Sequence, residues 1–120
     1  MRVPLRALAH ARSGDKGDSS NIVVVAYEAE FHAPLAAQLT AAKVKQHFAG
    51  AVTGAVERYE VARLGVLNFV LHGALGGGVS RSLCLDNYGK ALGAAILSVE
   101  IEVPDASAPR LRGPRRAPTR

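Results

Sequence analysis

The chain has 120 residues, a length that suits one domain, and 48% of them are hydrophobic, enough to form a core. Only 5% are aromatic and none is Trp, so the core must be aliphatic. The formal net charge of +5 is concentrated at one end, because residues 104–120 hold five arginines and one aspartate while residues 1–103 carry about +1. A nearly neutral folded part argues against a nucleic-acid-binding protein, which needs a basic face built into its fold.

The cysteine count and the hydropathy pattern indicate in which cellular compartment the protein is expected. Cys84 is the only cysteine, so no intramolecular disulfide can form, which fits a reducing environment. Pro4, Arg6 and His10 interrupt the N-terminal apolar residues, so the pattern of a signal peptide is missing. No segment approaches the ~20 apolar residues that cross a bilayer. These features predict a cytoplasmic protein without a membrane partner.

Two strands are predicted near the N-terminus. Residues 3–11 alternate in a period of two, which is typical of a half-buried strand, and residues 22–27 form a β-branched run typical of a central strand. Between them, residues 12–21 contain no apolar side chain, and we interpret them as a long polar loop. Since ordinary connections are about 4–6 residues long, a longer loop with acids, bases and glycines favours a binding function.

Helices and a further strand are expected next. Residues 31–49 are predicted to be helical, with Pro34 in a first turn and Thr40 as the N-cap of a second short helix that ends at Gly50. Residues 55–62 alternate again and predict a strand.

The second half of the chain has one ambiguous segment. The apolar positions of residues 64–75 fit a helical stripe, in which Asn68 and His72 lie one turn apart on the same face, and a strand is the weaker alternative. Residues 80–102 predict a hairpin. After Val103 the Pro- and Arg-rich composition predicts a disordered tail, which divides the chain into a domain at 1–103 and a tail at 104–120.

These elements predict the fold class. Several antiparallel strands interleaved with helices indicate an α+β two-layer sandwich, with a mainly antiparallel sheet and the helices on one face. A ferredoxin-like arrangement is the natural small version of this architecture.

The polar segment 12–21 permits three kinds of chemistry. Glycine amides and basic side chains can hold a phosphate or carboxylate, two aspartates can ligate a hard cation, and an acid beside a base can transfer protons. The alternative is a solvated loop whose polar side chains only stabilise turns. The residues concerned are Arg12, Ser13, Gly14, Asp15, Lys16, Gly17, Asp18 and Asn21.

A second candidate segment follows Asn68. His72, beside a glycine run, suits a general base or a ligand, or else a helix cap, and the run with Arg81 can wrap an anion or form a plain connection. We hypothesise that the two segments meet in one polar site, with Asp15, Lys16 and His72 as candidates for catalysis. No closely spaced His/Cys set is present, so neither a metal nor a cofactor is predicted.

Three stretches resemble one known family. They are AHARSGDKGD (residues 9–18), LNFVLHGALGGG (residues 67–78) and SRSL (residues 80–83), and together they look like the small C-terminal domain of the acyclic terpene utilisation protein AtuA, over roughly residues 5–102. The resemblance implies a ferredoxin-like fold and an association with the breakdown of acyclic terpenoids or branched acyl-CoA compounds. The positions that match the two motifs are Arg12, Ser13, Asp15, Lys16, Asp18 and Asn21, then Asn68, His72, Gly76, Gly77, Gly78 and Arg81.

The resemblance carries no assigned reaction, so three functional hypotheses stay open. In the first, the chain is an accessory domain that binds a larger AtuA-like subunit and contributes to a shared site for an acyl-CoA or carboxylate. In the second, it is a stand-alone homo-oligomeric binding protein or small enzyme with its site at a subunit interface. In the third, it binds nucleic acid through the basic tail.

Overall fold

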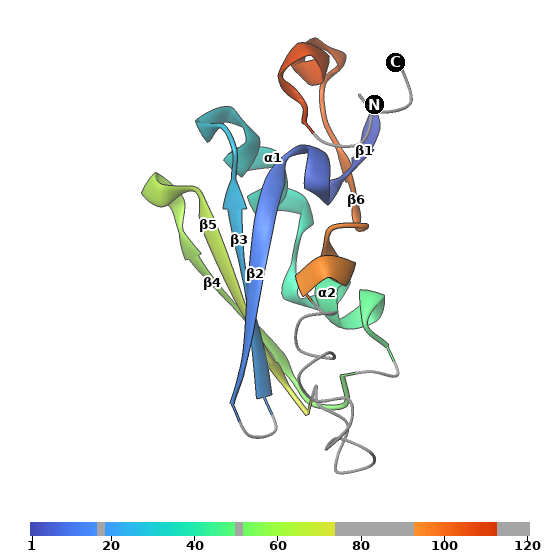
Figure 1. Cartoon of the computed structure of the whole chain (residues 1–120). Coiled ribbons are helices and arrows are strands. Elements are labelled where there is room, and N and C mark those ends of the chain that lie inside the picture. The colour runs from blue at the N-terminus through green and yellow to red at the C-terminus, as the bar shows by residue number, and fades with distance from the viewer. Residues whose placement is uncertain (17–18, 50–51, 74–92, 113–120) are drawn as a thin grey trace.

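The computed structural model describes residues 1–16, 19–49, 52–73 and 93–112, and the side chains of Asp15 and Lys16 lie outside this description. The strands and helices follow one another along the chain as Figure 1 shows. They are β1 (Arg2–Pro4), β2 (Ala9–Lys16), β3 (Ser19–Ala26), α1 (Ala29–Gln38), α2 (Ala41–His47), β4 (Val56–Val61), β5 (Val66–His72) and β6 (Glu100–Glu102). None of the described helices is long and apolar enough to cross a membrane.

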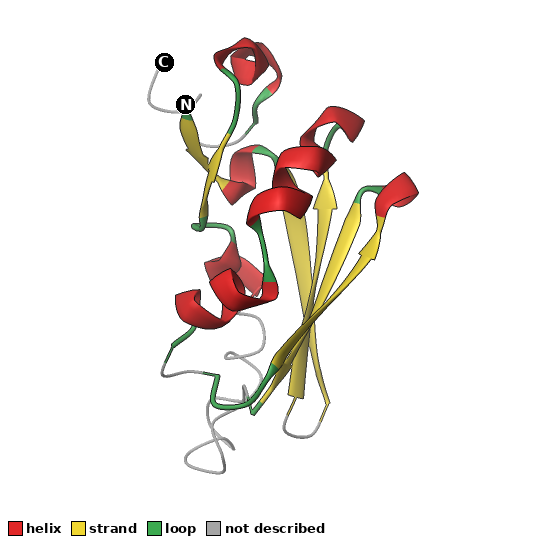
Figure 2. Cartoon of the chain, turned by 180° about the vertical axis from the view of Figure 1, so that it is seen from behind, coloured by secondary structure: helices red, strands yellow, loops and turns green. Residues whose placement is uncertain are grey.

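The main sheet has four antiparallel strands in the order β2-β3-β5-β4, and β1 pairs separately with β6. Helices α1 and α2 lie on one side of this sheet, together with the β1–β6 pair (Figures 1 and 2). Within the described part of the chain, no element covers the other side, which we call the open face. The predicted α+β sandwich with helices on one face is therefore confirmed.

The core lies between the sheet and the helices, and the strands contribute every second residue to it. Buried and half-buried side chains alternate along β3 and β5, because successive strand residues point to opposite faces. The helices complete this layer with their own buried residues. The fully or almost fully buried core side chains of these four elements are Ile22, Val24, Phe31, Leu35, Val44, Leu67, Phe69 and Leu71.

The expected strand at residues 3–11 is interrupted. A 3-10 helix, Leu5–Ala7, separates β1 from β2, and the Leu5 N–H donates to the Val99 carbonyl oxygen at 2.7 Å. The alternating pattern survives this break because Leu5 and Ala7 are both buried in the turn. The residues of the predicted first strand therefore belong to two different sheets, because β1 pairs with β6 and β2 joins the four-stranded sheet.

The prediction of a polar loop at residues 12–21 is wrong. Residues 12–16 continue β2 and residues 19–21 begin β3, so the segment is the end of a β-hairpin. Arg12 and Asn21 point to the open face of the sheet, where strand residues can be polar. Ser20 points to the helix side and is buried, and its hydroxyl donates a hydrogen bond to the Gly14 carbonyl oxygen at 2.8 Å. The lack of apolar side chains therefore did not mark a loop.

The preferred helix at residues 64–75 is also wrong, and the strand alternative is correct for residues 66–72. This segment forms β5, which hydrogen-bonds to β3 on one side and β4 on the other. Val70 lies on the open face, so apolar residues occur on both faces and imitate a helical stripe. The residues after Gly73 in this prediction lie outside the described chain.

The hairpin expected at residues 80–102 is wrong in its second arm, and its first arm lies outside the described residues. Residues 93–96 form a helical turn, and β6 pairs with β1 near the N-terminus. Four apolar residues of this arm are buried in the core, namely Ile96, Val99, Ile101 and Val103. Burial in a helical turn and a short strand produced the pattern that we read as one strand.

The other predictions of secondary structure hold with small changes. The helical region is confirmed as α1 and α2, and Thr40 caps α2 because its Oγ1 accepts a hydrogen bond from the Lys43 N–H at 3.1 Å. The strand expected at residues 55–62 is confirmed as β4. Pro34 lies inside α1 rather than in its first turn, since the helix already begins at Ala29, and Gly50 lies outside the described residues.

The disordered tail predicted after residue 103 is wrong up to residue 112. A 3-10 helix, Asp105–Arg110, follows β6, and the next residue, Leu111, is fully buried. The Arg112 N–H donates to the Ala7 carbonyl oxygen at 2.9 Å, and the Arg112 guanidinium lies 4.2 Å from the centre of the Tyr27 ring. Packing of one leucine and stacking of one arginine thus fix a segment whose composition suggested disorder.

We predict that Leu111 anchors the C-terminal segment. Leu111→Ala should lower the free energy of unfolding by about 2–4 kcal/mol, the usual loss when a buried leucine is truncated. Arg110→Ala is the matched control, because it removes only the exposed ion pair with Glu30 and should lose less than about 1 kcal/mol. Urea denaturation measures both. Equal losses for the two variants would mean that Leu111 is not an anchor.

Candidate functional site

The sheet register brings the two sequence segments together. Ser19 pairs with His72, Asn21 with Val70 and Val23 with Asn68 across the β3–β5 ladder. Directly paired residues in an antiparallel sheet point to the same face. Asn21, Asn68 and His72 are therefore neighbours on the open face, near the end of the β2–β3 hairpin.

A chain of polar side chains runs from β3 across β5 to β4. Ser19 Oγ lies 3.4 Å from His72 Nδ1, and His72 Nε2 lies 3.6 Å from Glu57 Oε2. The Tyr59 hydroxyl donates a hydrogen bond to Glu57 Oε1 at 2.8 Å. Three strands thus contribute to one connected network.

A second contact lies beside this network. Asn21 Nδ2 donates to Asn68 Oδ1 at 3.4 Å, again between β3 and β5. Both amides are half-buried, so each retains groups that can bond to a ligand. We call the residues of the network and of this contact the open-face cluster: Ser19, Asn21, Glu57, Tyr59, Asn68 and His72.

The hairpin places its first basic residue on the same face. Arg12 is exposed on β2 and pairs with Val23, which in turn pairs with Asn68. Gly14 pairs with Asn21, and a Cβ atom added at Gly14 would lie only 3.1 Å from Asn21 Oδ1. The glycine therefore leaves room for the Asn21 amide.

Ser13 does not belong to the cluster. It pairs with buried Ile22 and so points to the helix side of the sheet. There it packs against Gly93, where an added Cβ atom would lie 2.7 Å from Ser13 Oγ. These residues border an open hollow of about 520 Å³. The structure thus separates Ser13 from the residues that it was grouped with.

The remaining predicted site residues are only partly described. The backbones of Asp15 and Lys16 pair with Ser20 and Ser19, so two strand spacings, about 10 Å, separate Asp15 from β5. Their side chains are not described. The predicted site residues that lie outside the described chain are Gly17, Asp18, Gly76, Gly77, Gly78 and Arg81.

Sequence reasoning missed Glu57 and Tyr59. Both are polar positions of the strand predicted at residues 55–62, and its alternation already placed one set of residues on a common face. The alternation does not indicate which strand lies next to this one in the sheet. Pairing with β5, opposite Val70 and Asn68, brings these two residues to the site.

The network perturbs one titratable group. The hydrogen bond that Tyr59 donates to Glu57, together with the negative charge of that carboxylate, raises the pKa of Tyr59 above its ordinary value of 10.0. The neutral phenol is the donor, so the bond exists only while Tyr59 is protonated. Tyr59 therefore holds one Glu57 oxygen, while the other faces His72.

The geometry suits binding better than nucleophilic attack. The order Ser19, His72, Glu57 resembles a catalytic triad, yet its distances of 3.4 and 3.6 Å exceed the 2.6–3.2 Å typical of an activated serine. Within the described chain, no group of three or more His, Cys, Asp or Glu side chains is placed to hold a metal ion. The cluster offers amide, imidazole and hydroxyl groups to a polar ligand.

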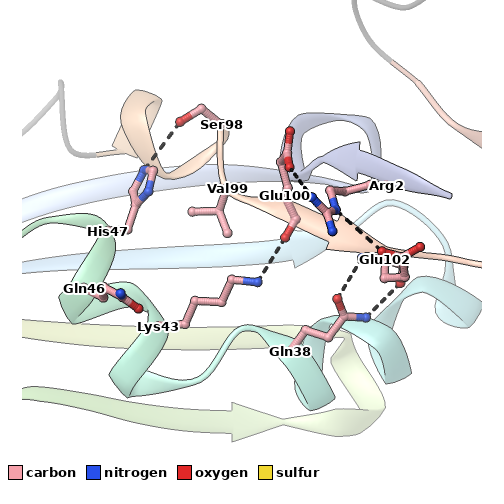
Figure 3. Close-up of a pocket in the computed structure, with 9 residues that line it drawn as sticks. All are labelled: Arg2, Gln38, Lys43, Gln46, His47, Ser98, Val99, Glu100 and Glu102. Carbon is pink, nitrogen blue, oxygen red and sulfur yellow. Dashed lines mark hydrogen bonds and ion pairs between the residues drawn. The ribbon is translucent and has the colours of Figure 1, made fainter.

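A larger hollow lies on the helix side, with a volume of about 570 Å³ (Figure 3). Its polar side chains bond partly to protein main chain and partly to one another, since Arg2 forms ion pairs with Glu100 and Glu102. Gln38 bonds to both the N–H and the carbonyl oxygen of Glu102, and Lys43 Nζ donates to the Glu100 carbonyl oxygen. These contacts occupy the backbone edge of β6 that β1 does not use. The polar groups of this hollow therefore mainly connect the helices to β6, and the open-face cluster is the better candidate site.

Comparison with known families supports the sequence resemblance. The family model of the AtuA ferredoxin-like domain matches residues 3–102. The chain belongs to this family. The predicted ferredoxin-like fold is thereby confirmed, and the matched range contains every residue of the open-face cluster. No curated protein and no solved structure matches this AtuA ferredoxin-like domain.

We predict that Glu57 controls the ionisation of Tyr59. Glu57→Gln removes the carboxylate charge and should move the pKa of Tyr59 down toward 10.0, as measured by phenolate absorbance against pH. A Tyr59→Phe variant supplies the baseline from the other tyrosines. Because folding raises this pKa, the bond contributes stability below pH 10 and loses it as the pH rises through the raised value. An unchanged titration in the glutamine variant would contradict the network.

Proposed function

We propose that this AtuA ferredoxin-like domain is an accessory domain in the breakdown of acyclic terpenoids or branched acyl-CoA compounds. It contributes the open-face cluster to a binding site that it shares with a second polypeptide surface. The ligand is an acyl-CoA or a carboxylate. The observation that carries the proposal is the convergence of polar residues from three strands on a sheet face that no described element covers.

The chemistry of the cluster supports an oxygen-rich, anionic ligand. The Asn21 and Asn68 amides and the His72 ring supply donors for a carbonyl or carboxylate oxygen. Arg12, exposed on the same face, supplies a positive charge and a planar fork of donors that match a carboxylate or phosphate. Binding and orientation are thus within reach of these residues.

The flatness of the site supports a shared arrangement. Sites for drug-sized ligands usually enclose most of the ligand in about 300–1,000 Å³ and often lie at interfaces. Among the described residues the cluster lies on the uncovered surface of a sheet, and we infer that another polypeptide supplies the second wall. A larger AtuA-like subunit is one such partner, and another copy of this domain is the alternative.

The contacts of the C-terminal segment weigh against nucleic-acid binding. Arg110 forms an ion pair with Glu30 at 2.9 Å, and Arg112 approaches Glu28 at 3.5 Å while stacking on Tyr27. Two of the five arginines after residue 103 are thus already engaged within the fold. The basic charge available for phosphate groups is correspondingly smaller.

We predict that binding of a branched acyl-CoA depends on the open face. With isovaleryl-CoA as the probe, Arg12→Ala should weaken binding at least tenfold, because a charge-assisted contact of about 1.5–3 kcal/mol is lost. His72→Ala should weaken binding by a smaller factor. Isothermal titration calorimetry measures both effects. Lys45→Ala, an exposed charge on the helix side, is the matched control and should bind as the native chain does.

The identity of the partner needs a separate experiment. A tagged chain purified from its native host should bring down an AtuA-like large subunit, identified by mass spectrometry. Repeated recovery of the chain without that subunit would count against the accessory role. Equal affinities of isovaleryl-CoA for the Arg12 and Lys45 variants would remove the open face as the ligand site.

A further inference from the structure

The open face carries more apolar surface than a solvated sheet needs. Beyond the cluster, toward the end of the sheet where β4 finishes, the next open-face row consists of His10, Val25, Val66 and Val61. Val61 is 42% exposed, and Tyr59, in the adjacent row of the cluster, is 53% exposed. The other apolar side chains of this face are half-buried: Val23, Val25, Val66 and Val70.

Among the described side chains, the acidic residue and the arginine on this face lie at its opposite edges. Arg12 is exposed on β2, at one edge of the sheet, and Glu57 is exposed on β4, at the other edge. In the two register rows between them lie Val23 and Val70 together with the Asn21 and Asn68 amides. A surface that is positive along one edge and negative along the other is complementary to a copy of itself.

We propose that the open face binds the same face of a second copy of this chain, about a two-fold axis parallel to the strands. This inference rests on the proposed function, because it names the second wall of the shared site. Aligned packing of two sheet faces at about 10 Å is a common arrangement in proteins. The axis direction follows from the charges.

A two-fold axis along the strands places β2 of one copy over β4 of the other at the same level. Arg12 then faces Tyr59, since both belong to the register row that runs through Val23 and Asn68. Glu57 lies two residues further along, about 7 Å away, within reach of an arginine side chain. An arginine over an aromatic ring and beside a carboxylate is stabilised by both. An axis across the strands would instead place like-charged edges over each other.

The area of the face is sufficient for a reversible dimer. Four strands at about 4.8 Å and eight residues at about 3.4 Å give roughly 500 Å² from each copy. The total of roughly 1,000 Å² is at the lower limit of specific interfaces, so micromolar affinity is expected. The same axis places the two open-face clusters at one end of the pair, facing each other.

The decisive experiment exchanges the charges between copies. Arg12→Glu and Glu57→Arg should each weaken self-association at least tenfold, as measured by sedimentation velocity over a concentration series at low salt. Mixed together, the two variants should form a heterodimer with affinity close to that of the native pair, because each variant supplies the charge that the other now needs. Lys45→Glu, on the helix side, is the control of equal charge change and should dimerise normally.

Each other outcome overturns the inference. A native chain that stays monomeric at about 100 μM, near the weak end for a face of this size, has no such dimer. A dimer whose affinity is unchanged by both charge changes uses a different surface. If the two variants do not restore each other's association, Arg12 of one copy does not face Glu57 of the other, and the proposed pair is wrong. Circular dichroism of both variants checks folding. Isovaleryl-CoA binding to His72→Ala, which keeps both charges, tests the proposed function separately from dimerisation.

Discussion

The ladder between β3 and β5 is the constraint on which the site depends. It fixes seven residue pairs, from Ser19 with His72 to Val25 with Val66. One face of this ladder carries Ile22, Phe69 and their buried neighbours under the helices. A slip of one residue would expose these side chains and bury the polar set, so hydrophobic burial on one face determines which polar groups meet on the other. The cluster is a consequence of core packing, although none of its members lies in the core.

The sequence predicts elements better than it predicts partners. The alternation of β4 and the β-branched run of β3 were sufficient to identify both strands, and a capping threonine located the start of α2. Residues 12–21 and 66–72 were misread largely because an open sheet face tolerates polar residues in one strand and apolar residues in another, and in the hairpin the helix side also carries Ser13 and Ser20. Neither pattern is then strictly periodic. The pairing of these segments with other strands identifies them as strands. This pairing joins residues far apart in the sequence, so no local pattern reveals it.

The same reasoning explains the site predictions. Asn21 was found as the last residue of a polar segment, Asn68 as a polar residue within an apolar run and His72 as a polar residue beside a glycine. Glu57 does not stand out among the alternating charges of its strand. Its part in the site comes from lying diagonally across from His72, which no local pattern encodes. The error at residues 104–112 is similar, since this segment is held by contacts of Arg112 with Ala7 and Tyr27 in the N-terminal third of the chain.

A two-fold pair of open faces has a consequence for stoichiometry. The two clusters face each other at one end, separated by about the 10 Å of a sheet-to-sheet spacing, which is the thickness of one layer of side chains. In the proposed dimer, two CoA moieties entering from the same end would bring their phosphates close together. Repulsion between these charges would disfavour the second ligand, so we expect the pair to bind one acyl-CoA in preference to two. The valines on either side would then contact the branched acyl group, which connects the apolar and polar parts of the face in one function.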